Sequence, residues 1–570
     1  MKTIKMMMAA AGLVWASASV YADTWMDEST GITWMYSVVG DHIRIGSGSS
    51  HVAAISTSTT GAVVIPDEIA DLPVKEIGVE AFYNCTGLTS VTIPDGVTSI
   101  GNYAYYGCSG LTSVTIPNGV TSIGSYAFYR CAGLTNITIP ASVTSIGSSA
   151  FYGCSGLQGF VVDEANPNYK SVNGLLLSKN GEELILGLNG EVTIPDGVTS
   201  IGVSAFNGCS GLTSVTIPNS VMSIGERAFC YCSGLTSVTI PSGVTCIGAS
   251  AFYGCNALTN ITLPASVTSI GSSAFYGCSG LLGFVVDEAN PNYKSVNGLL
   301  LSKNGEELIL GLNGEVTIPD GVTIIGESAF NGCSGLTSVT IPDSVTNIGY
   351  CAFYNCTGLT SVSIPNSVTT IGEKAFSGCS GLTGITIPNG VTSIGYRAFS
   401  GCSGLTSVTI LNGAAKVGED AFDSCANITD VVIPQGVWMA KVFSSYQSIT
   451  NVVIATGATS IGYNAFDGCT GLTSVTIPAS VTNIADYAFS GCSGLTSIAI
   501  PDGVTSIGRS AFSDCSGLTS IAIPDGVTSI GWSAFSGCSA LQEFVVDESH
   551  PSYKSVNGLL LSKDGGRRTK

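Results

Sequence analysis

The chain has 570 residues, of which 45% are hydrophobic and only 10% are charged, and its formal net charge is −19. This apolar fraction excludes a disordered chain, and the lack of a run of about 18 apolar residues beyond the N-terminal region argues against a bundle of membrane-spanning helices. The acidic balance argues against nucleic acid or an anionic membrane as a partner, because both require basic patches.

The N-terminus has the pattern of a secretory signal peptide. Lys2 and Lys5 precede a short apolar stretch, and Val20 and Ala22 occupy the −3 and −1 positions of a cleavage site. We therefore expect residues 1–22 to be removed after Ala22. The mature chain is expected to be secreted or displayed at the cell surface, without a transmembrane segment. The alternative is a buried first helix.

Residues 23–60 differ from the rest of the chain. Apolar residues alternate from 32 to 38, a Gly-Asp pair at 40–41 provides a turn, and alternation resumes at 43–45. This pattern predicts a β-hairpin. Because it precedes a repeat array, we interpret it as an N-terminal cap that covers the first exposed edge.

Residues 61–564 form an array of 23-residue repeats. There are 18 positions with an Ala-Phe pair or its equivalent, and cysteines recur at the same step in four series. The cysteines in register are Cys85, Cys108, Cys131, Cys154, Cys209, Cys232, Cys255, Cys278, Cys333, Cys356, Cys379, Cys402, Cys425, Cys469, Cys492, Cys515 and Cys538. Such a period predicts a solenoid of about 18 turns, in which each turn buries its apolar side only against its neighbours.

One repeat, residues 88–108, shows how a turn is built. Leu88, Val91 and Ile93 have the spacing of a short strand with its inner side chains in the core, whereas the serine and threonines between them point outward. A Pro-Asp-Gly run ends the strand, and Val97 and Ile100 return to the core. Residues 104, 105 and 108 fit one face of a short helical or turn segment. About eight positions per turn are therefore expected to be buried.

Longer inserts interrupt the period near 160–189 and 284–313, and a third copy occupies 544–564. Each of the first two carries an Asn-Gly pair between apolar runs, as at Asn180 and Gly181, which predicts a hairpin. Residues 136–202 and 260–326 differ at only three positions, so the segment looks duplicated. The tail 565–570 does not match the earlier copies, and we interpret it as irregular, with a truncated or frame-shifted end as one explanation.

The pattern Leu-x-x-Val-x-Ile-Pro-x-Gly/Ser-Val-Thr-x-Ile-Gly-x-x-Ala-Phe-x-x-Cys resembles the BspA-like class of leucine-rich repeat proteins, over roughly residues 60–563. The resemblance implies a parallel β-sheet on the concave face and short helical or turn segments on the convex side. It also implies a secreted or cell-surface adhesin that binds host or matrix proteins, glycans or other cells. The family supplies no catalytic residues. One departure is that Pro-Asp-Gly or Pro-Asn-Ser follows the strand where an asparagine ladder is usual.

The cysteines in register are interpreted as a buried thiol ladder rather than as disulfides. They share one repeat position with small and aromatic neighbours, and stacked parallel side chains are poorly aimed at each other for a bond. Cys230, Cys246 and Cys351 fall outside the register and are predicted to be the more reactive or bridging thiols. Cys230 and Cys232 form only a weak candidate metal pair, since no histidine accompanies them.

The outward strand positions are the best candidate binding face. They repeat a Thr-Ser-x-Thr pattern, which gives a hydroxyl-lined surface suited to a protein or glycan, although high strand propensity alone also explains threonine there. The candidate residues are Thr89, Ser90, Thr92, Thr112, Ser113, Thr115, Thr236, Ser237, Thr239, Thr473, Ser474 and Thr476.

Catalysis finds little support in the sequence. The three histidines, His42, His51 and His550, are far apart in a linear array, and no nucleophile elbow, phosphate loop or metalloprotease motif occurs. Asp502 and Asp525 stack in adjacent turns and could hold Ca²⁺, but solvated turn aspartates are the simpler interpretation. We predict a protein that is not an enzyme and has no cofactor. It either binds an extracellular ligand or serves as a passive surface-layer spacer, and an ice-binding threonine face is a minor third hypothesis.

Overall fold

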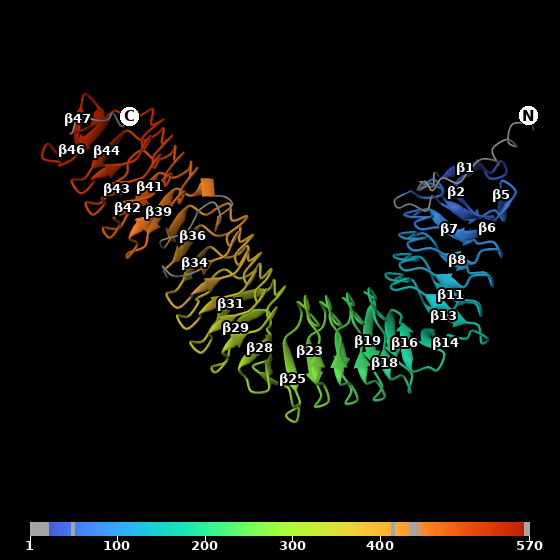
Figure 1. The fold of residues 1–570 in the computed structure, drawn as a ribbon. Helices are drawn as coiled ribbons and strands as arrows, with labels where there is room; N and C mark the ends of the chain where they lie inside the picture. The colour runs from blue at the N-terminus through green and yellow to red at the C-terminus, as the bar shows by residue number, and fades with distance from the viewer. Residues whose placement is uncertain (1–21, 47–51, 412–415, 434–441, 444–445, 564–570) are drawn as a thin grey trace, which may run out of the picture. The chain divides into compact units, whose positions relative to one another are not determined.

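The computed structural model describes residues 22–46, 52–411, 416–433, 442–443 and 446–563. The apolar part of the predicted signal peptide, His51 and the 565–570 tail lie outside these residues. The chain divides into two compact units, 1–233 and 234–570. Within each unit, short strands stack one turn behind the next (Figure 1), so the predicted leucine-rich repeat solenoid is confirmed.

Each turn has three sides, which we call the first ladder, the second ladder and the turn side. In the repeat 88–108, β7 (Leu88–Thr92) belongs to the first ladder and pairs in parallel with β9 (Ser113–Thr115). β8 (Ser99–Ile100) belongs to the second ladder and pairs in parallel with β10 (Ser122–Ile123). Both ladders use the hydrogen-bonding pattern of parallel sheets, in which neighbouring strands lie about 4.8 Å apart.

The turn side is formed by consecutive tight turns. The Tyr105 N–H donates to the Ala127 carbonyl of the next turn at 2.7 Å, and the N–H groups two residues before and after it bond in the same way. Tyr103 and Gly107 have φ values of 56° and 72°, which interrupts any helix and aims alternate N–H groups along the stack. The sequence predicts either short helical segments or turns on this side of the repeat. In the structure these segments are turns. The described residues also include a short 3-10 turn, η1 (Tyr446–Ser448).

The inserts contribute turns of their own. Each one places a strand in the first ladder, namely β13 (Gly159–Val162), β25 (Gly283–Val286) and β46 (Glu543–Val546), but carries no Ala-Phe pair. The 18 Ala-Phe positions therefore correspond to about 21 turns. The predicted hairpin at Asn180-Gly181 is present, with β15 (Leu175–Ser178) antiparallel to β16 (Glu183–Leu186).

The other strands of unit 1 belong to the cap, the ladders or the first insert. In chain order they are β1 (Asp23–Met26), β2 (Thr33–Val39), β3 (His42–Ile45), β4 (Gly61–Val64), β5 (Glu68–Ile69), β6 (Leu72–Ile77), β11 (Asn136–Ile139), β12 (Ser145–Ile146), β14 (Tyr169–Val172), β17 (Gly190–Thr193), β18 (Ser200–Ile201), β19 (Leu212–Thr216) and β20 (Ser223–Ile224). The predicted cap hairpin is found as β2 antiparallel to β3, and β3 continues in parallel onto β6, so the cap extends the second ladder.

Unit 2 repeats the arrangement. Its remaining strands are β21 (Ser237–Thr239), β22 (Cys246–Ile247), β23 (Asn260–Leu263), β24 (Ser269–Ile270), β26 (Tyr293–Val296), β27 (Leu299–Ser302), β28 (Glu307–Leu310), β29 (Gly314–Thr317), β30 (Ile324–Ile325), β31 (Leu336–Thr340), β32 (Asn347–Ile348), β33 (Thr370–Ile371), β34 (Gly384–Ile387), β35 (Ser393–Ile394), β36 (Ser407–Ile410), β37 (Lys416–Val417), β38 (Asp430–Ile433), β39 (Asn451–Ile454), β40 (Ser460–Ile461), β41 (Ser474–Thr476), β42 (Asn483–Ile484), β43 (Ser506–Ile507), β44 (Ser520–Ile523), β45 (Ser529–Ile530), β47 (Tyr553–Val556) and β48 (Leu559–Ser562).

The core is a set of side-chain columns that run through the stack. All eight positions expected to be buried in the repeat 88–108 are at most 4% exposed. The phenylalanine column is the most regular: Phe353, Phe376 and Phe399 stack face to face with centroids 4.9 and 5.2 Å apart. Because each turn buries its apolar residues only against the turns beside it, these columns are the main stabilising contacts.

Candidate functional site

In many repeats, though not at Thr89, the hydroxyl of the threonine that follows the leucine is hydrogen-bonded to the preceding turn. The Thr112 hydroxyl donates to the Thr89 carbonyl at 2.9 Å, and that of Thr473 donates to Thr450 at 3.0 Å. A second row in the Thr-Ser-Ile segment does the same, as in the 3.1 Å bond from Thr121 to the Thr98 carbonyl. These rows link side chains to the backbone of the preceding turn. These two threonine rows therefore hold successive turns together by hydrogen bonds.

The serine and the second threonine of the Thr-Ser-x-Thr motif behave differently, because their side chains point outward and are available to a ligand. Ser90 pairs with Ser113 in register, and Thr92 with Thr115, so unit 1 carries a two-by-two array of hydroxyls, half-buried at Ser90 and exposed at the other three. We call these four residues the hydroxyl face. None of their side chains is hydrogen-bonded to another described residue.

The other candidate residues do not join this array. Thr236, Ser237 and Thr239 lie on or next to β21, whereas Thr473, Ser474 and Thr476 lie on or next to β41, and about ten turns separate the two groups within unit 2. All six are exposed. The structure thus brings together the unit 1 candidates only.

The cysteines in register form a column of free, mostly buried thiols. The Cys108 Sγ donates to the Phe82 carbonyl of the preceding turn at 3.0 Å, and the same contact recurs along the array at up to 3.2 Å. Burial raises the pKa of Cys85 to about 11 and that of Cys154 to about 12. Because the thiolate is the reactive form, these two thiols are inert near neutral pH.

The three cysteines outside the register have different surroundings. Cys230 and Cys351 are 5% and 6% exposed, and burial raises the pKa of Cys230 to about 11. Cys246, in β22, is half-exposed on the second ladder. Cys246 is therefore the most accessible of the three. The reactivity predicted for the set stays a prediction.

Sequence reasoning missed an aromatic surface on the turn side of unit 1. Two tyrosine columns stand side by side, one with stacked centroids 4.8, 4.7 and 4.5 Å apart and the other with a pair 5.0 Å apart. We call their members the tyrosine surface: Tyr83, Tyr106, Tyr129 and Tyr152 in the first column and Tyr103 and Tyr126 in the second. All six are half-buried. Tyrosine at the positions directly after and two before the Ala-Phe phenylalanine is the signal that would have revealed it.

The tyrosine surface is polar as well as aromatic. The Arg130 guanidinium lies 5.4 Å from the Tyr129 ring centroid, a cation–π contact. Burial raises the pKa of Tyr152, and Tyr129 beside it adds to the effect. The hydroxyl therefore stays protonated and can both donate and accept hydrogen bonds.

Unit 2 carries smaller aromatic groups on its own turn side, among them the stacked pair of Tyr253 and Tyr276, whose ring centroids are 4.6 Å apart. Trp532 and Tyr396 are 66% and 39% exposed. The Arg509 guanidinium lies 5.3 Å from the Trp532 ring, and that of Arg397 lies 5.0 Å from the Tyr396 ring. These pairs are spaced by several turns, so they do not form a continuous surface like that of unit 1.

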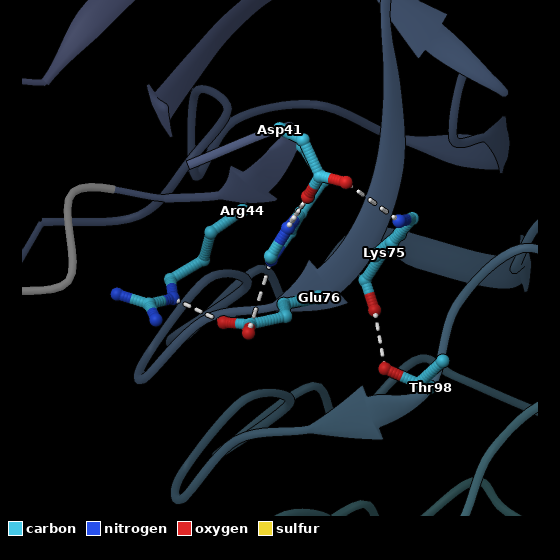
Figure 2. Close-up of polar contacts among 6 residues, drawn as sticks. Asp41, Arg44, Lys75, Glu76 and Thr98 are labelled. Atoms are coloured by element: carbon cyan, nitrogen blue, oxygen red, sulfur yellow. Dashed lines mark hydrogen bonds and ion pairs between the residues drawn. The ribbon is translucent and has the colours of Figure 1, made fainter. Parts of the chain in front are cut away.

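A charged cluster ties the cap to the first turns of unit 1 (Figure 2). Glu76 in β6 accepts a 2.6 Å hydrogen bond from Arg44 Nε and one of 3.2 Å from His42 Nε2, both on β3. The other ring nitrogen of His42 lies 3.0 Å from Asp41, which also contacts Lys75 at 3.6 Å. Burial opposes ionisation of Glu76, but the hydrogen bonds from Arg44 and His42 outweigh it, and the pKa of Glu76 is lowered. These contacts join the cap strand β3 to β6 in the first turns of the repeat array.

Neither a metal centre nor a membrane helix is found in the part of the chain that the structure describes. No three histidine, cysteine or acidic residues there gather as metal ligands. Asp502 and Asp525 are exposed in successive turns, as solvated turn residues would be. No helix in that part is both long and apolar enough to span a bilayer.

Stacked parallel strands, buried leucine and phenylalanine columns and side-chain ladders to the preceding turn together define a leucine-rich repeat solenoid. The sequence pattern described as the BspA type Leucine rich repeat region (6 copies) matches residues 75–173, 189–294, 313–437 and 439–555. The chain belongs to this family.

Several solved structures of bacterial leucine-rich repeat proteins are similar to the chain. A leucine-rich cell surface protein of Faecalibacterium prausnitzii A2-165 is 30% identical over 80% of this chain and 96% of its own, with a TM-score of 0.35. A protein of Bacteroides ovatus is 23% identical over 90% and 92%, with a TM-score of 0.36, and one of Eubacterium ventriosum is 22% identical over 94% and 99%, with a TM-score of 0.32. No match is found among curated proteins.

Proposed function

We propose that the chain is an exported, non-catalytic adhesion protein that binds an extracellular protein or glycan through the tyrosine surface of unit 1. The observation that carries this proposal is the pair of stacked, half-buried tyrosine columns. Tyrosine offers a large, rigid and amphipathic contact area at low entropic cost, which is why it is enriched in binding surfaces.

Chemistry elsewhere in unit 1 is consistent with this assignment. The tyrosine surface and the hydroxyl face consist of uncharged side chains, with Arg130 and Glu80 as charged neighbours, so they suit hydroxyl-rich glycans or neutral protein surfaces better than nucleic acid. Tyrosine recurs over four successive turns in the first column, from Tyr83 to Tyr152, which presents equivalent contacts at steps of about 4.8 Å. A ligand with repeated epitopes would gain avidity from such an array even when each contact is weak.

The test uses the chain's own repeats to choose variants that fold. Serine occupies the position of Tyr106 and Tyr129 in several other turns, for example Ser377 and Ser400. We expect the double variant Tyr106→Ser/Tyr129→Ser to reduce binding to a panel of matrix proteins, glycans and whole cells at least tenfold.

The matched control removes hydroxyls from the other candidate surface. Alanine replaces threonine at the Thr92 position in other turns, as at Ala499, so Thr92→Ala/Thr115→Ala is compatible with the fold. We expect this variant to bind like the unchanged chain. Loss of binding in the alanine variant alone would move the site to the hydroxyl face. Ordered self-assembly of the purified chain without binding to any panel member would favour the spacer function instead.

A further inference from the structure

Where complete turns meet in the described part of the chain, a row of backbone hydrogen bonds on the turn side recurs from one turn to the next. In the turn before the second insert, the N–H groups of alternate residues donate to carbonyls of the next turn. These bonds run from Ser250 to Ser272 at 2.9 Å, from Phe252 to Ala274 at 2.7 Å and from Gly254 to Tyr276 at 2.8 Å. Three donors per turn in a straight row are thus a constant feature of this side.

The second insert leaves one such row without acceptors. After β25 and the hairpin of β26 and β27, the chain passes from β28 through residues 311–313 straight into β29, so this turn lacks its turn-side segment. The N–H groups of Ser273, Phe275 and Gly277 consequently have no acceptor among the described residues. Phe275 is 5% exposed, so its N–H is buried as well as unpaired. A buried N–H without a partner is rare because it carries the full desolvation cost.

The opposite wall offers acceptors. The carbonyls of Glu327 and Asn331 receive no hydrogen bond from the described residues, whereas Ala329 between them accepts one from the Gly311 N–H at 2.7 Å. The Asn331 Oδ1 atom is also buried without a partner. Both walls line a cavity of about 260 Å³, whose apolar floor includes Leu281 and other aliphatic and aromatic side chains.

The gap is held open by the residues that replace the missing segment. The Asn313 side chain donates to the Ser279 carbonyl at 2.9 Å and accepts from the Gly335 N–H at 2.9 Å, so its amide takes the place of a peptide group between the two walls. Gly311 lies directly under the Phe330 ring, where an added Cβ would come within 2.0 Å of a ring carbon. These contacts fix the spacing of the walls.

We propose that this slot binds a short peptide segment of a partner polypeptide through its backbone. Three N–H donors on alternate residues require carbonyls at the same spacing, and in uninterrupted stretches of the chain the next turn supplies them, as Ser272, Ala274 and Tyr276 do for the preceding turn. Neighbouring turns lie about 4.8 Å apart, and the two walls of the slot are separated by the one turn that lacks its turn-side segment. The space between the walls therefore has room for one layer of peptide. The segment would pair by strand-addition recognition, in which main-chain hydrogen bonds provide the affinity. Small side chains fit best, because Tyr276 leans over Gly332 and narrows the entrance.

The first insert repeats the arrangement in unit 1. Ser149, Phe151 and Gly153 have unpaired N–H groups there, and Asn207 Oδ1 is buried without a partner. The Asn189 side chain donates to the Ser155 carbonyl at 3.1 Å, as its counterpart does in unit 2. The cavity is only about 20 Å³, however. The slot of unit 2 is therefore the binding site that we propose, and it is independent of the tyrosine surface.

The test uses the full chain and a capped peptide, acetyl-Ser-Ala-Ala-Ser-Gly-amide, as the probe. We expect the amides of Ser273, Phe275 and Gly277 to exchange hydrogen rapidly in the free protein, and at least tenfold more slowly at saturating peptide. The paired amides of Ser250 and Phe252 in the preceding turn serve as internal references, with exchange that the peptide leaves unchanged.

A filling variant tests the location. Asn331→Tyr places in the slot the residue that Tyr276 and Tyr354 have at the same repeat position, and we expect it to reduce peptide binding at least tenfold. The control Ser377→Tyr makes the same change in an uninterrupted stretch and is expected to bind normally. A second measurement does not depend on the folding of the variant. A peptide that is N-methylated at alternate amides should not bind to the unchanged protein. No protection by the probe, or equal binding of the probe and its methylated form, would overturn the proposal and leave water as the occupant.

Discussion

Replacing Tyr105 with phenylalanine is expected to stabilise the stack. Tyr105 is the one tyrosine in the phenylalanine column, fully buried between Phe82 and Phe128 with ring centroids 4.9 and 5.0 Å away. Its hydroxyl has no hydrogen-bond partner among the described residues, and burial raises its pKa well above the usual value. A buried unpaired hydroxyl costs about 1–3 kcal/mol, while its removal leaves a void of only one oxygen atom. A net gain of about 1–2 kcal/mol follows for Tyr105→Phe.

Native-state hydrogen exchange is the appropriate assay, because a long array does not unfold in two states. The Phe82 and Tyr105 amides donate to Ala104 and Ala127, both at 2.7 Å, and so report on opening at this position. A gain of 1–2 kcal/mol corresponds to exchange slower by a factor of about 5–30. The half-buried neighbour provides the control, since Tyr106→Phe should leave these rates within about twofold. Unchanged or faster exchange in Tyr105→Phe would refute the reasoning and place a bound water on the hydroxyl.

Three further predictions concern the cap, the thiols and the inserts. Because hydrogen bonds from Arg44 and His42 outweigh burial and lower the folded pKa of Glu76, its contribution to stability is present above the unfolded value of about 4.3 and is lost as pH falls through the folded pKa. The protection factors of amides in β3 and β6, which correct for the intrinsic pH dependence of exchange, should fall in acid, and Glu76→Gln should remove that dependence. Maleimide should label Cys246 of the native chain before the other two cysteines outside the register, as mass spectrometry of tryptic peptides would show; equal labelling of all three would contradict their burial. Gly187→Ala should cost about 1–3 kcal/mol through overpacking, because the new Cβ would lie 2.0 Å from the Phe206 ring, and unaltered exchange of the Phe206 amide would argue against this contact.

The core was predictable because its signal is the repeat itself. Positions such as Val91 and Ile100 recur at one spacing, and only a stack of short strands buries them all. The roles of the side chains on the surface were less visible. In the sequence, threonine at the Thr112 position is explained by its high strand propensity. Its hydrogen bond to the preceding turn depends on the register of the ladder, which the sequence does not show. The tyrosine surface was missed because the position after the phenylalanine changes from Tyr129 to serine, asparagine or aspartate along the chain.

The inserts show the limit of sequence reasoning more sharply. The Asn-Gly pair at 180–181 predicts the hairpin, but not that β16 enters the second ladder beside β18 and so omits a turn-side segment. That omission has a consequence for function. In an uninterrupted solenoid each turn satisfies the backbone of the next, so unmet hydrogen-bonding capacity arises only where a segment is left out. Copying the insert copies such a place, as the N–H groups at Phe151 in the first copy and Phe275 in the second show, since neither has an acceptor among the described residues. Duplication of this segment would therefore multiply such places, while each added turn keeps the same core.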